Sequence, residues 1–293
     1  MAILVPATRR DRYNPQLFRY RYNWAPFLIR RFFTAFSLMS QRFFVARPID
    51  GERAELVEQE AHHLLHVMRG RVGDEVVLFD GSGAEFDARV VRTSRSTVDL
   101  EVTARREVDR ETRRAVTLGI ALPKGDRQKW LIEKAVELGV TCCVPLETRR
   151  GVAQPESSAL ERLRKSVVEA SKQCGRNRLM ELREPMELAE FLSAAPADAT
   201  RWFAHPPDEP SSGSATPPSH QLELSVTADS ESDTATNPCI WLAVGPEGGF
   251  TDEEATAARQ TKWRSVGLGP RILRIETAAL ALVAVALAPT EWT

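Results

Sequence analysis

The amino-acid sequence predicts an α/β protein of two domains: a small β-rich domain, then a larger domain with a mostly parallel sheet. Between Arg42 and about Arg106, short strand-like apolar runs alternate with turn residues, and one helical segment interrupts them. From Val116 onward strand-like and helix-like segments alternate, which is typical of parallel sheets covered by helices. With 293 residues, 43% of them hydrophobic, the chain is long enough for two cores.

Two segments do not fit a packed core. The first 42 residues carry eight Arg and one acidic residue. We interpret residues 1–41 as a disordered or targeting leader, or as the product of a start site placed too far upstream, because Met39 directly precedes the first strand-like run. Residues 207–238 contain five Pro, seven Ser and six acidic residues but no Lys or Arg. This composition predicts a disordered acidic insert.

The first domain, residues 42–110, is expected to form a small β-barrel or open sheet. Residues 58–68 place apolar side chains at helical spacing and predict a helix. Asp80-Gly81-Ser82-Gly83 lies between two strands, which indicates a hairpin turn and not a phosphate-binding loop. The predicted strands are Phe43–Val45, Glu75–Phe79, Ala88–Val91 and Val98–Val102.

The second domain, residues 115–293, opens with a predicted strand, Val116–Ala121. A helix follows from the N-cap candidate Asp126 to about Leu138, where Gly139 is suited to end it. A strand at 142–145 and an amphipathic helix at 157–173 come next. Strand and helix thus alternate as a parallel sheet requires.

The strongest local motif is a strand, Ile240–Val244, that runs into Gly245-Pro246-Glu247-Gly248-Gly249-Phe250. Thr251 and Glu254 follow at the spacing of a capping box, which marks the start of a helix. Glycines at the carboxyl end of a parallel strand let a ligand approach the backbone amides closely. A plain tight turn is the alternative, and neither a GxGxxG nor a Walker pattern is present.

A second motif, Leu268–Ala279, leads into an apolar helix. Arg271, Arg274 and Glu276 directly precede or begin that helix. Charged residues at the start of a helix too hydrophobic to face solvent indicate a ligand or a partner subunit. A surface turn with solvated arginines is the alternative.

Four blocks of sequence together resemble the RsmE-type ribosomal RNA methyltransferases. They occur in the order that the family shows and extend from about residue 42 to 288. The blocks are Arg42–Val45 with His62–Leu64, Leu122–Arg127 with Glu133–Gly139, Gln173–Arg176, and the two motifs above.

The resemblance implies a PUA-like RNA-binding β-barrel over residues 42–110 and a SPOUT-type α/β methyltransferase domain with a trefoil knot over residues 115–293. It also implies a homodimer, with the apolar last helix and the Glu133–Gly139 helix as candidate contacts. S-adenosylmethionine is the implied cofactor, held by three loops. The cofactor-binding residues expected from the family are His205, Val244, Gly245, Pro246, Glu247, Gly248, Gly249, Leu268, Gly269, Arg271, Ile272, Leu273, Thr277 and Ala278.

The implied reaction is methylation of N3 of a uridine in the 16S rRNA of the small ribosomal subunit. Because N3 bears a proton, Glu247, Glu276 or a neighbouring water is a candidate acceptor, although Glu247 has the alternative role of fixing its loop. Arg274 is the catalytic candidate for stabilising charge on the uracil oxygens, with Arg271 as its alternative. The predicted RNA-binding residues are Arg42, His63, Arg69, Lys124, Arg127, Arg149 and Arg176.

Other features narrow the function. A net charge of −1 gives no overall basic field, so any RNA surface depends on local clusters. The four cysteines show no CxxC spacing, and His62 and His66 lack a third ligand, so no metal is expected. The apolar run Thr277–Ala288 is too short to span a membrane, and a cytoplasmic protein is expected.

Three other functions are alternatives to methylation of 16S rRNA. A knotted methyltransferase that acts on another RNA would carry the same cofactor loops. An RNA-binding or ribosome-assembly module with a vestigial site would bind no cofactor, and the intact glycines of Gly245–Gly249 argue against it. A nucleotide-dependent oxidoreductase lacks its GxGxxG turn here and is set aside.

Overall fold

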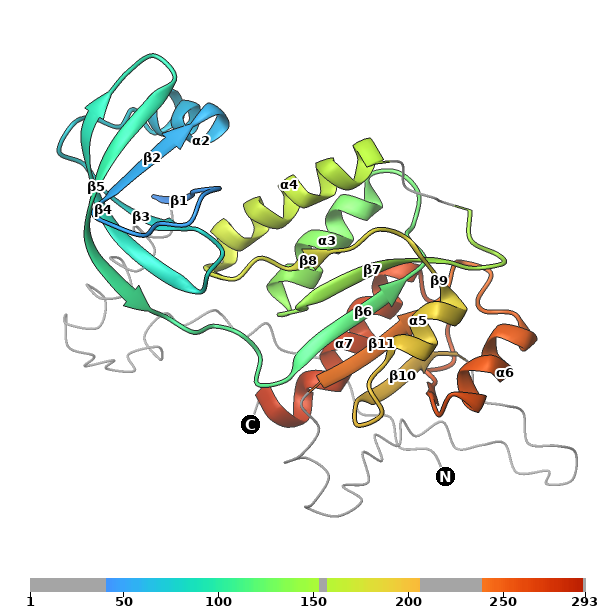
Figure 1. The fold of residues 1–293 in the computed structure, drawn as a ribbon. Helices are drawn as coiled ribbons and strands as arrows, with labels where there is room; N and C mark the ends of the chain where they lie inside the picture. The colour runs from blue at the N-terminus through green and yellow to red at the C-terminus, as the bar shows by residue number, and fades with distance from the viewer. Residues whose placement is uncertain (1–40, 153–156, 206–238, 292–293) are drawn as a thin grey trace, which may run out of the picture.

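The computed structural model describes residues 41–152, 157–205 and 239–291 of the chain (Figure 1). Two sheets form, one within residues 42–107 and one within residues 115–266. The predicted leader, except for its last residue, and the predicted acidic insert 207–238 lie outside the described residues.

The first sheet is a curled five-stranded sheet in the order β1-β3-β4-β5-β2. The pair β1/β3 is parallel and the other pairs are antiparallel. This confirms the predicted β-rich first domain. Strand β2 was not predicted, because only Leu56 in it is buried and the apolar signal is weak. The strands are β1 (Arg42–Phe44), β2 (Arg53–Val57), β3 (Glu75–Phe79), β4 (Ala84–Thr93) and β5 (Thr97–Glu107), and the helical turns are α2 (Glu58–His62) and η1 (His63–Val67).

The second sheet has seven strands in the order β12-β10-β11-β6-β7-β8, and β9 pairs with β7. All of its pairs are parallel, as the alternation of strands and helices predicted. The strands are β6 (Ala115–Ile120), β7 (Cys142–Glu147), β8 (Glu181–Leu182), β9 (Met186–Glu187), β10 (Thr200–Ala204), β11 (Cys239–Val244) and β12 (Arg264–Val266).

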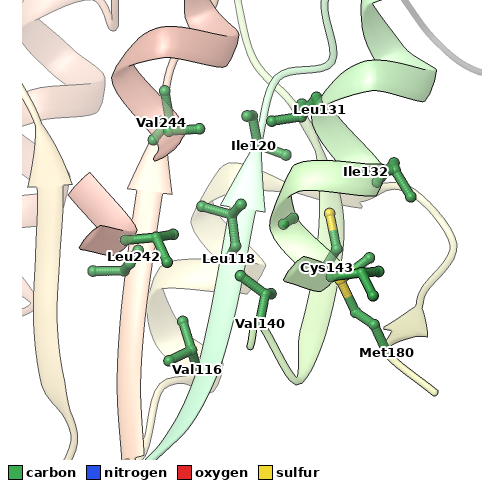
Figure 2. Close-up of a cluster of buried hydrophobic side chains, with 14 of the residues drawn as sticks. Val116, Leu118, Ile120, Leu131, Ile132, Val140, Cys143, Met180, Leu242 and Val244 are labelled. Atoms are coloured by element: carbon green, nitrogen blue, oxygen red, sulfur yellow. The ribbon is translucent and has the colours of Figure 1, made fainter. Parts of the chain in front are cut away.

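Helices cover both faces of this sheet. On one face, α3 (Arg127–Glu137), α4 (Ser157–Cys174) and α7 (Ile275–Glu291) enclose the larger core. Figure 2 shows Leu118 and Ile120 of β6 packed near Leu131 of α3, and all three side chains are fully buried. On the other face, α5 (Leu188–Ala194) and α6 (Asp252–Gln260) cover the aromatic cluster around Phe191. Burial of each such apolar side chain contributes roughly 1.5–3 kcal/mol to the free energy of unfolding. The packed sheet therefore gives its loops a rigid support.

The two ends of α3 match the prediction unequally. Gly139 has a φ of +86°, the left-handed conformation that ends a helix. Asp126 occupies the N-cap position, but its side chain makes no capping hydrogen bond. Asp126 is therefore the N-cap residue, as predicted, but its backbone is already helical there and its side chain does not cap the helix.

Buried charges join the two domains. Glu85 of β4 accepts a hydrogen bond from Arg110 at 2.7 Å and pairs with Arg42 of β1. Arg42 also bonds the side chain of Asn177, beyond α4. Lys172 of α4 is 2.8 Å from Glu60 of the first domain. The first domain is therefore fixed against the α4 end of the second.

This network corrects the prediction that Arg42 and Arg176 bind RNA. Their exposed fractions are only 6% and 3%. Arg176 donates to the carbonyl of Val136 in the last turn of α3 at 3.0 Å and to that of Val140 just beyond the helix at 2.9 Å, and it pairs with Glu111. Both arginines are structural, because neither guanidinium can reach a phosphate at the surface.

Glu85→Ala is expected to lower the free energy of unfolding by about 3–5 kcal/mol, because it leaves the buried Arg42 without its carboxylate. The matched control is Glu75→Ala, which removes an exposed ion pair with Arg89 and is expected to cost less than about 1 kcal/mol. Urea denaturation measures both values. If both variants lost the same free energy of unfolding, the buried Glu85 network would not be a major stabilising contact.

The stabilisation that Glu85 provides is expected to depend on pH. Burial opposes the charge of Glu85, but the guanidinium groups of Arg110 and Arg42 outweigh it and hold the pKa of Glu85 below its ordinary 4.5. The stability difference between wild type and Glu85→Ala should therefore be complete above pH 4.5 and decline as pH falls through the lower folded-state pKa.

Candidate functional site

Three loops follow three neighbouring parallel strands and meet at one edge of the second sheet. The last residue of β10, Ala204, is in register with Val244 of β11 and Val266 of β12. The backbone N–H of His205 donates to the carbonyl of Val266 at 3.2 Å and continues the pairing beyond the strand. Parallel α/β sheets bind ligands at the carboxyl ends of their strands. The structure thus brings His205 together with both predicted loops.

The loop after β11 presents its backbone. The N–H of Gly249 donates to the carbonyl of Pro246 at 2.8 Å, and Gly249 has a φ of +68°. At Gly245 a Cβ atom would lie 3.1 Å from the backbone nitrogen of Phe250. Residues 247–248 are exposed, whereas 244–246 are buried. Gly245 thus lets the turn fold closely onto Phe250, and at Gly249, where a Cβ atom would meet nothing within 4 Å, the main chain is open to a ligand.

The loop is closed by the predicted capping box. The hydroxyl of Thr251 accepts from the N–H of Glu254 at 3.3 Å, and the carboxylate of Glu254 accepts from the N–H of Thr251 at 2.7 Å. The other oxygen of Glu254 accepts from the N–H of Arg149 at 2.8 Å. The start of α6 is thereby tied to the loop after β7.

The third loop connects β12 to α7. Gly269 has a φ of +95°, and Arg271 and Arg274 are exposed on either side of Ile272, which is 97% exposed. The carbonyl of Arg274 accepts from the N–H of Ala278 at 2.9 Å and begins the first turn of α7. Two arginines and an apolar side chain thus project from this edge. The remaining predicted positions differ in exposure: Leu268, Leu273 and Ala278 are half-buried and Thr277 is exposed.

A carboxylate–arginine cluster lies at the same edge. Arg127, the first residue of α3, donates to Glu247 at 3.2 Å and lies 3.6 Å from Glu276. Glu276 is 6% exposed, and its Oε2 has no hydrogen-bond partner in the described chain. Arg127 was predicted to bind RNA, and the spacing of the sequence gave no sign that it bridges two candidate catalytic carboxylates.

Exposed basic residues flank the three loops. Lys124 follows β6, and Arg149 and Arg150 follow β7, so all three lie at the carboxyl edge beside β11. Arg150 donates to the carbonyl of Gly248 at 2.7 Å and so braces the glycine turn. Part of the predicted basic set is therefore brought together by topology.

Two predicted RNA-binding residues belong to the first domain instead. His63 is half-buried, with its ring centroid 5.8 Å from that of Phe43. Arg69 is exposed and has a φ of +58°. Their role in RNA binding stays a prediction.

The thiols are poorly suited to nucleophilic chemistry. Burial raises the pKa of Cys142 to about 11 and raises the pKa of Cys143 still further. Burial also raises the pKa of Cys174 and Cys239. Because the thiolate is the reactive form, a covalent cysteine mechanism is disfavoured.

Two features are absent from the described residues. Among them, no three or more His, Cys, Asp or Glu side chains are grouped so as to hold a metal ion. In the same part of the chain, no helix combines the length and apolar character that crossing a membrane demands.

Family models match both domains. Residues 110–287 match the RNA methyltransferase domain, and residues 57–103 match the RNA methyltransferase PUA domain. The chain is therefore an RNA methyltransferase, with a PUA domain that precedes the methyltransferase domain in sequence.

Individual relatives narrow this class. The chain is 31% identical to a ribosomal RNA small subunit methyltransferase E from Synechocystis, over 82% of this chain and 75% of that protein. It is 29% identical to the Bacillus subtilis protein of the same name, over 76% of this chain and 84% of that one. The chain belongs to the ribosomal RNA small subunit methyltransferase E family, as its motifs suggested.

Two solved structures resemble this chain in fold over most of its length. A ribosomal RNA small subunit methyltransferase E from Neisseria gonorrhoeae, bound to S-adenosyl methionine, has a TM-score of 0.69 and 28% identity, covering 85% of this chain and 97% of that chain. A methyltransferase from Legionella pneumophila, in complex with the bound cofactor SAM, has a TM-score of 0.71 and 28% identity, covering 85% and 98%.

The thiols provide a test of the site chemistry. At pH 8 the thiolate fraction of Cys142 is expected to be about 100-fold below that of an ordinary cysteine, because its pKa rises from 9.0 to about 11. Iodoacetamide should therefore label Cys142 and Cys143 slowly in the native protein and rapidly in urea, as measured by peptide mass spectrometry. Rapid native labelling of either would contradict their burial.

Proposed function

We propose that this chain transfers a methyl group from S-adenosylmethionine to N3 of a uridine in 16S rRNA of the small ribosomal subunit. The observation that carries the proposal is the meeting of His205, the glycine turn and the Leu268–Leu273 loop at one sheet edge. Relatives with the same fold bind S-adenosyl methionine. The uridine target comes from the family resemblance.

Bound S-adenosylmethionine supplies an electrophilic methyl group, and the protein has to align it with the acceptor nitrogen. The backbone of Gly245–Gly249 is suited to hold the cofactor closely. In this proposal Glu276 or Glu247 takes the N3 proton. Arg274, exposed two residues before Glu276 in the sequence, is suited to stabilise negative charge on the uracil oxygens.

The RNA surface that we propose has two parts. Lys124 and Arg149 lie at the carboxyl edge of the sheet, near the cofactor loops. His63 and Arg69 belong to the PUA domain, which the buried ion pairs hold at a fixed position. Because phosphate contacts position a nucleic acid, the two parts together would place one uridine over the cofactor.

We further propose a homodimer of knotted chains that acts in the cytoplasm. Leu280, Ala281 and Val285 of α7 are apolar and only half-buried in the single chain, which supports a contact between subunits. After β12 the chain returns to pack α7 against β6 and β11, an arrangement compatible with the expected trefoil knot.

Titration calorimetry with S-adenosylmethionine, followed by incubation with undermethylated small subunits and mass mapping of the rRNA, tests the function. Wild type should bind the cofactor and yield N3-methyluridine. Gly245→Val should lose binding, since a side chain there meets the backbone of Phe250, whereas Gly51→Val, in open space, should behave as wild type. Binding without this product would move the target to another RNA, and no binding would favour an RNA-binding module.

Arg274→Ala should fold normally but lose methylation by about 100-fold or more, because one stabilising group is removed from the developing charge. Arg162→Ala is the matched control, since this arginine is exposed on α4 outside the three loops. Single-turnover methylation measures the rates and thermal melting measures folding. Wild-type turnover by Arg274→Ala would exclude a catalytic role.

A further inference from the structure

Arg127 projects from a firmly held piece of backbone. It is the first residue of α3, and Gly125 just before it has a φ of +66°. The side-chain amide of Gln128 donates to the carbonyl of Pro123 at 2.8 Å, and one turn later Leu131 is fully buried. The backbone that carries the Arg127 guanidinium is therefore fixed in position.

The guanidinium contacts two segments that are separate in sequence. Its Nη2 donates to Oε1 of Glu247, in the glycine turn, at 3.2 Å. Its Nη1 lies 3.6 Å from Oε2 of Glu276, in the first turn of α7. A planar guanidinium suits such a bridge, whereas a lysine ammonium is a single point charge. Arg127 thus links the start of α3 to the glycine turn and to the first turn of α7.

Glu276 is incompletely satisfied in this arrangement. Its side chain is 8% exposed, and Oε2 accepts no hydrogen bond within the described chain. The 3.6 Å approach of Arg127 is too long for a good hydrogen bond. A buried carboxylate oxygen ordinarily has a donor, and none within the described chain supplies it.

We propose that Arg127 is a positioning residue that holds Glu276 through their ion pair, so that Oε2, which accepts no hydrogen bond within the described chain, accepts one from an N–H or O–H group of a bound nucleoside. This inference rests on the proposed function, which brings two nucleosides to this edge: the adenosine part of the methyl donor and the target uridine. Both offer the same kind of donor. The bridge to Glu247 couples that contact to the glycine turn.

The test is a double-mutant cycle on Arg127→Ala and Glu276→Gln, read by S-adenosylmethionine affinity and by single-turnover methylation. Each single variant should lower one of these values at least about tenfold, because a charge-assisted contact is lost. In the Glu276→Gln background, Arg127→Ala should then cost no more than about twofold. Arg127→Lys should recover part of the loss.

Lys129→Ala is the matched control. Lys129 is on the same helix, is exposed, and its ion pair is with Glu133 at 3.7 Å, away from the carboxylate cluster. Its affinity and rate should equal those of wild type. Thermal melting of all variants separates unfolding from loss of function, and a variant that does not fold is replaced by Arg127→Gln.

The two readouts identify the nucleoside. Weaker cofactor binding by Glu276→Gln assigns the donor to the adenosine part, and slower methylation with unchanged binding assigns it to the uridine. Wild-type values for Arg127→Ala or Glu276→Gln, or losses that simply multiply in the double variant, would overturn the inference. Wild-type protein that binds the cofactor but leaves small subunits unmethylated would defeat the proposed substrate alone, and the cycle on cofactor affinity would then decide the inference.

Discussion

The parallel register of β10, β11 and β12 is the constraint on which the candidate site depends. Ala204, Val244 and Val266 end their strands side by side, so the loops that follow have to meet. The register is held by backbone pairing and by the helices buried on both faces of the sheet. A slip of one strand by a residue would separate His205 from the glycine turn and turn alternate side chains to the wrong face.

Charge serves two different purposes in this fold. Around Glu85, the buried Arg42 and the exposed Arg110 form a structural link between domains, because Arg42 also bonds Asn177 and Arg110 also donates to the carbonyl of Gly175. At the carboxyl edge of the sheet, Arg271 and Arg274 remain exposed, whereas Arg127 is engaged by two carboxylates and Arg150 by the carbonyl of Gly248. The same residue type therefore stabilises the domain arrangement in one place and is available for recognition in another. The partners of each arginine, and not its sequence motif, separate the two uses.

Family resemblance and geometry contribute different kinds of knowledge here. The resemblance supplied the cofactor, the RNA and the uridine, which no arrangement of loops could specify. Geometry supplied the bridge from Arg127 to Glu247 and Glu276 and the unsatisfied oxygen on the latter. It also removed Arg42 and Arg176 from the RNA surface, although both lie in blocks that carry the resemblance. A shared motif thus marks a residue as belonging to the family without stating whether its role is structural or functional.

The sequence alone determined the elements whose signal is local. The alternating strands and helices of the second domain, the glycine turn, the Thr251–Glu254 capping box and the end of α3 at Gly139 all follow from spacing and from conformational preference. The tertiary structure alone decided the strand order, which places β10 between β11 and β12, and the burial of each arginine. The physical reason is that backbone preference acts over a few residues, whereas desolvation and pairing of Glu85 or Glu276 depend on groups brought together from distant parts of the chain.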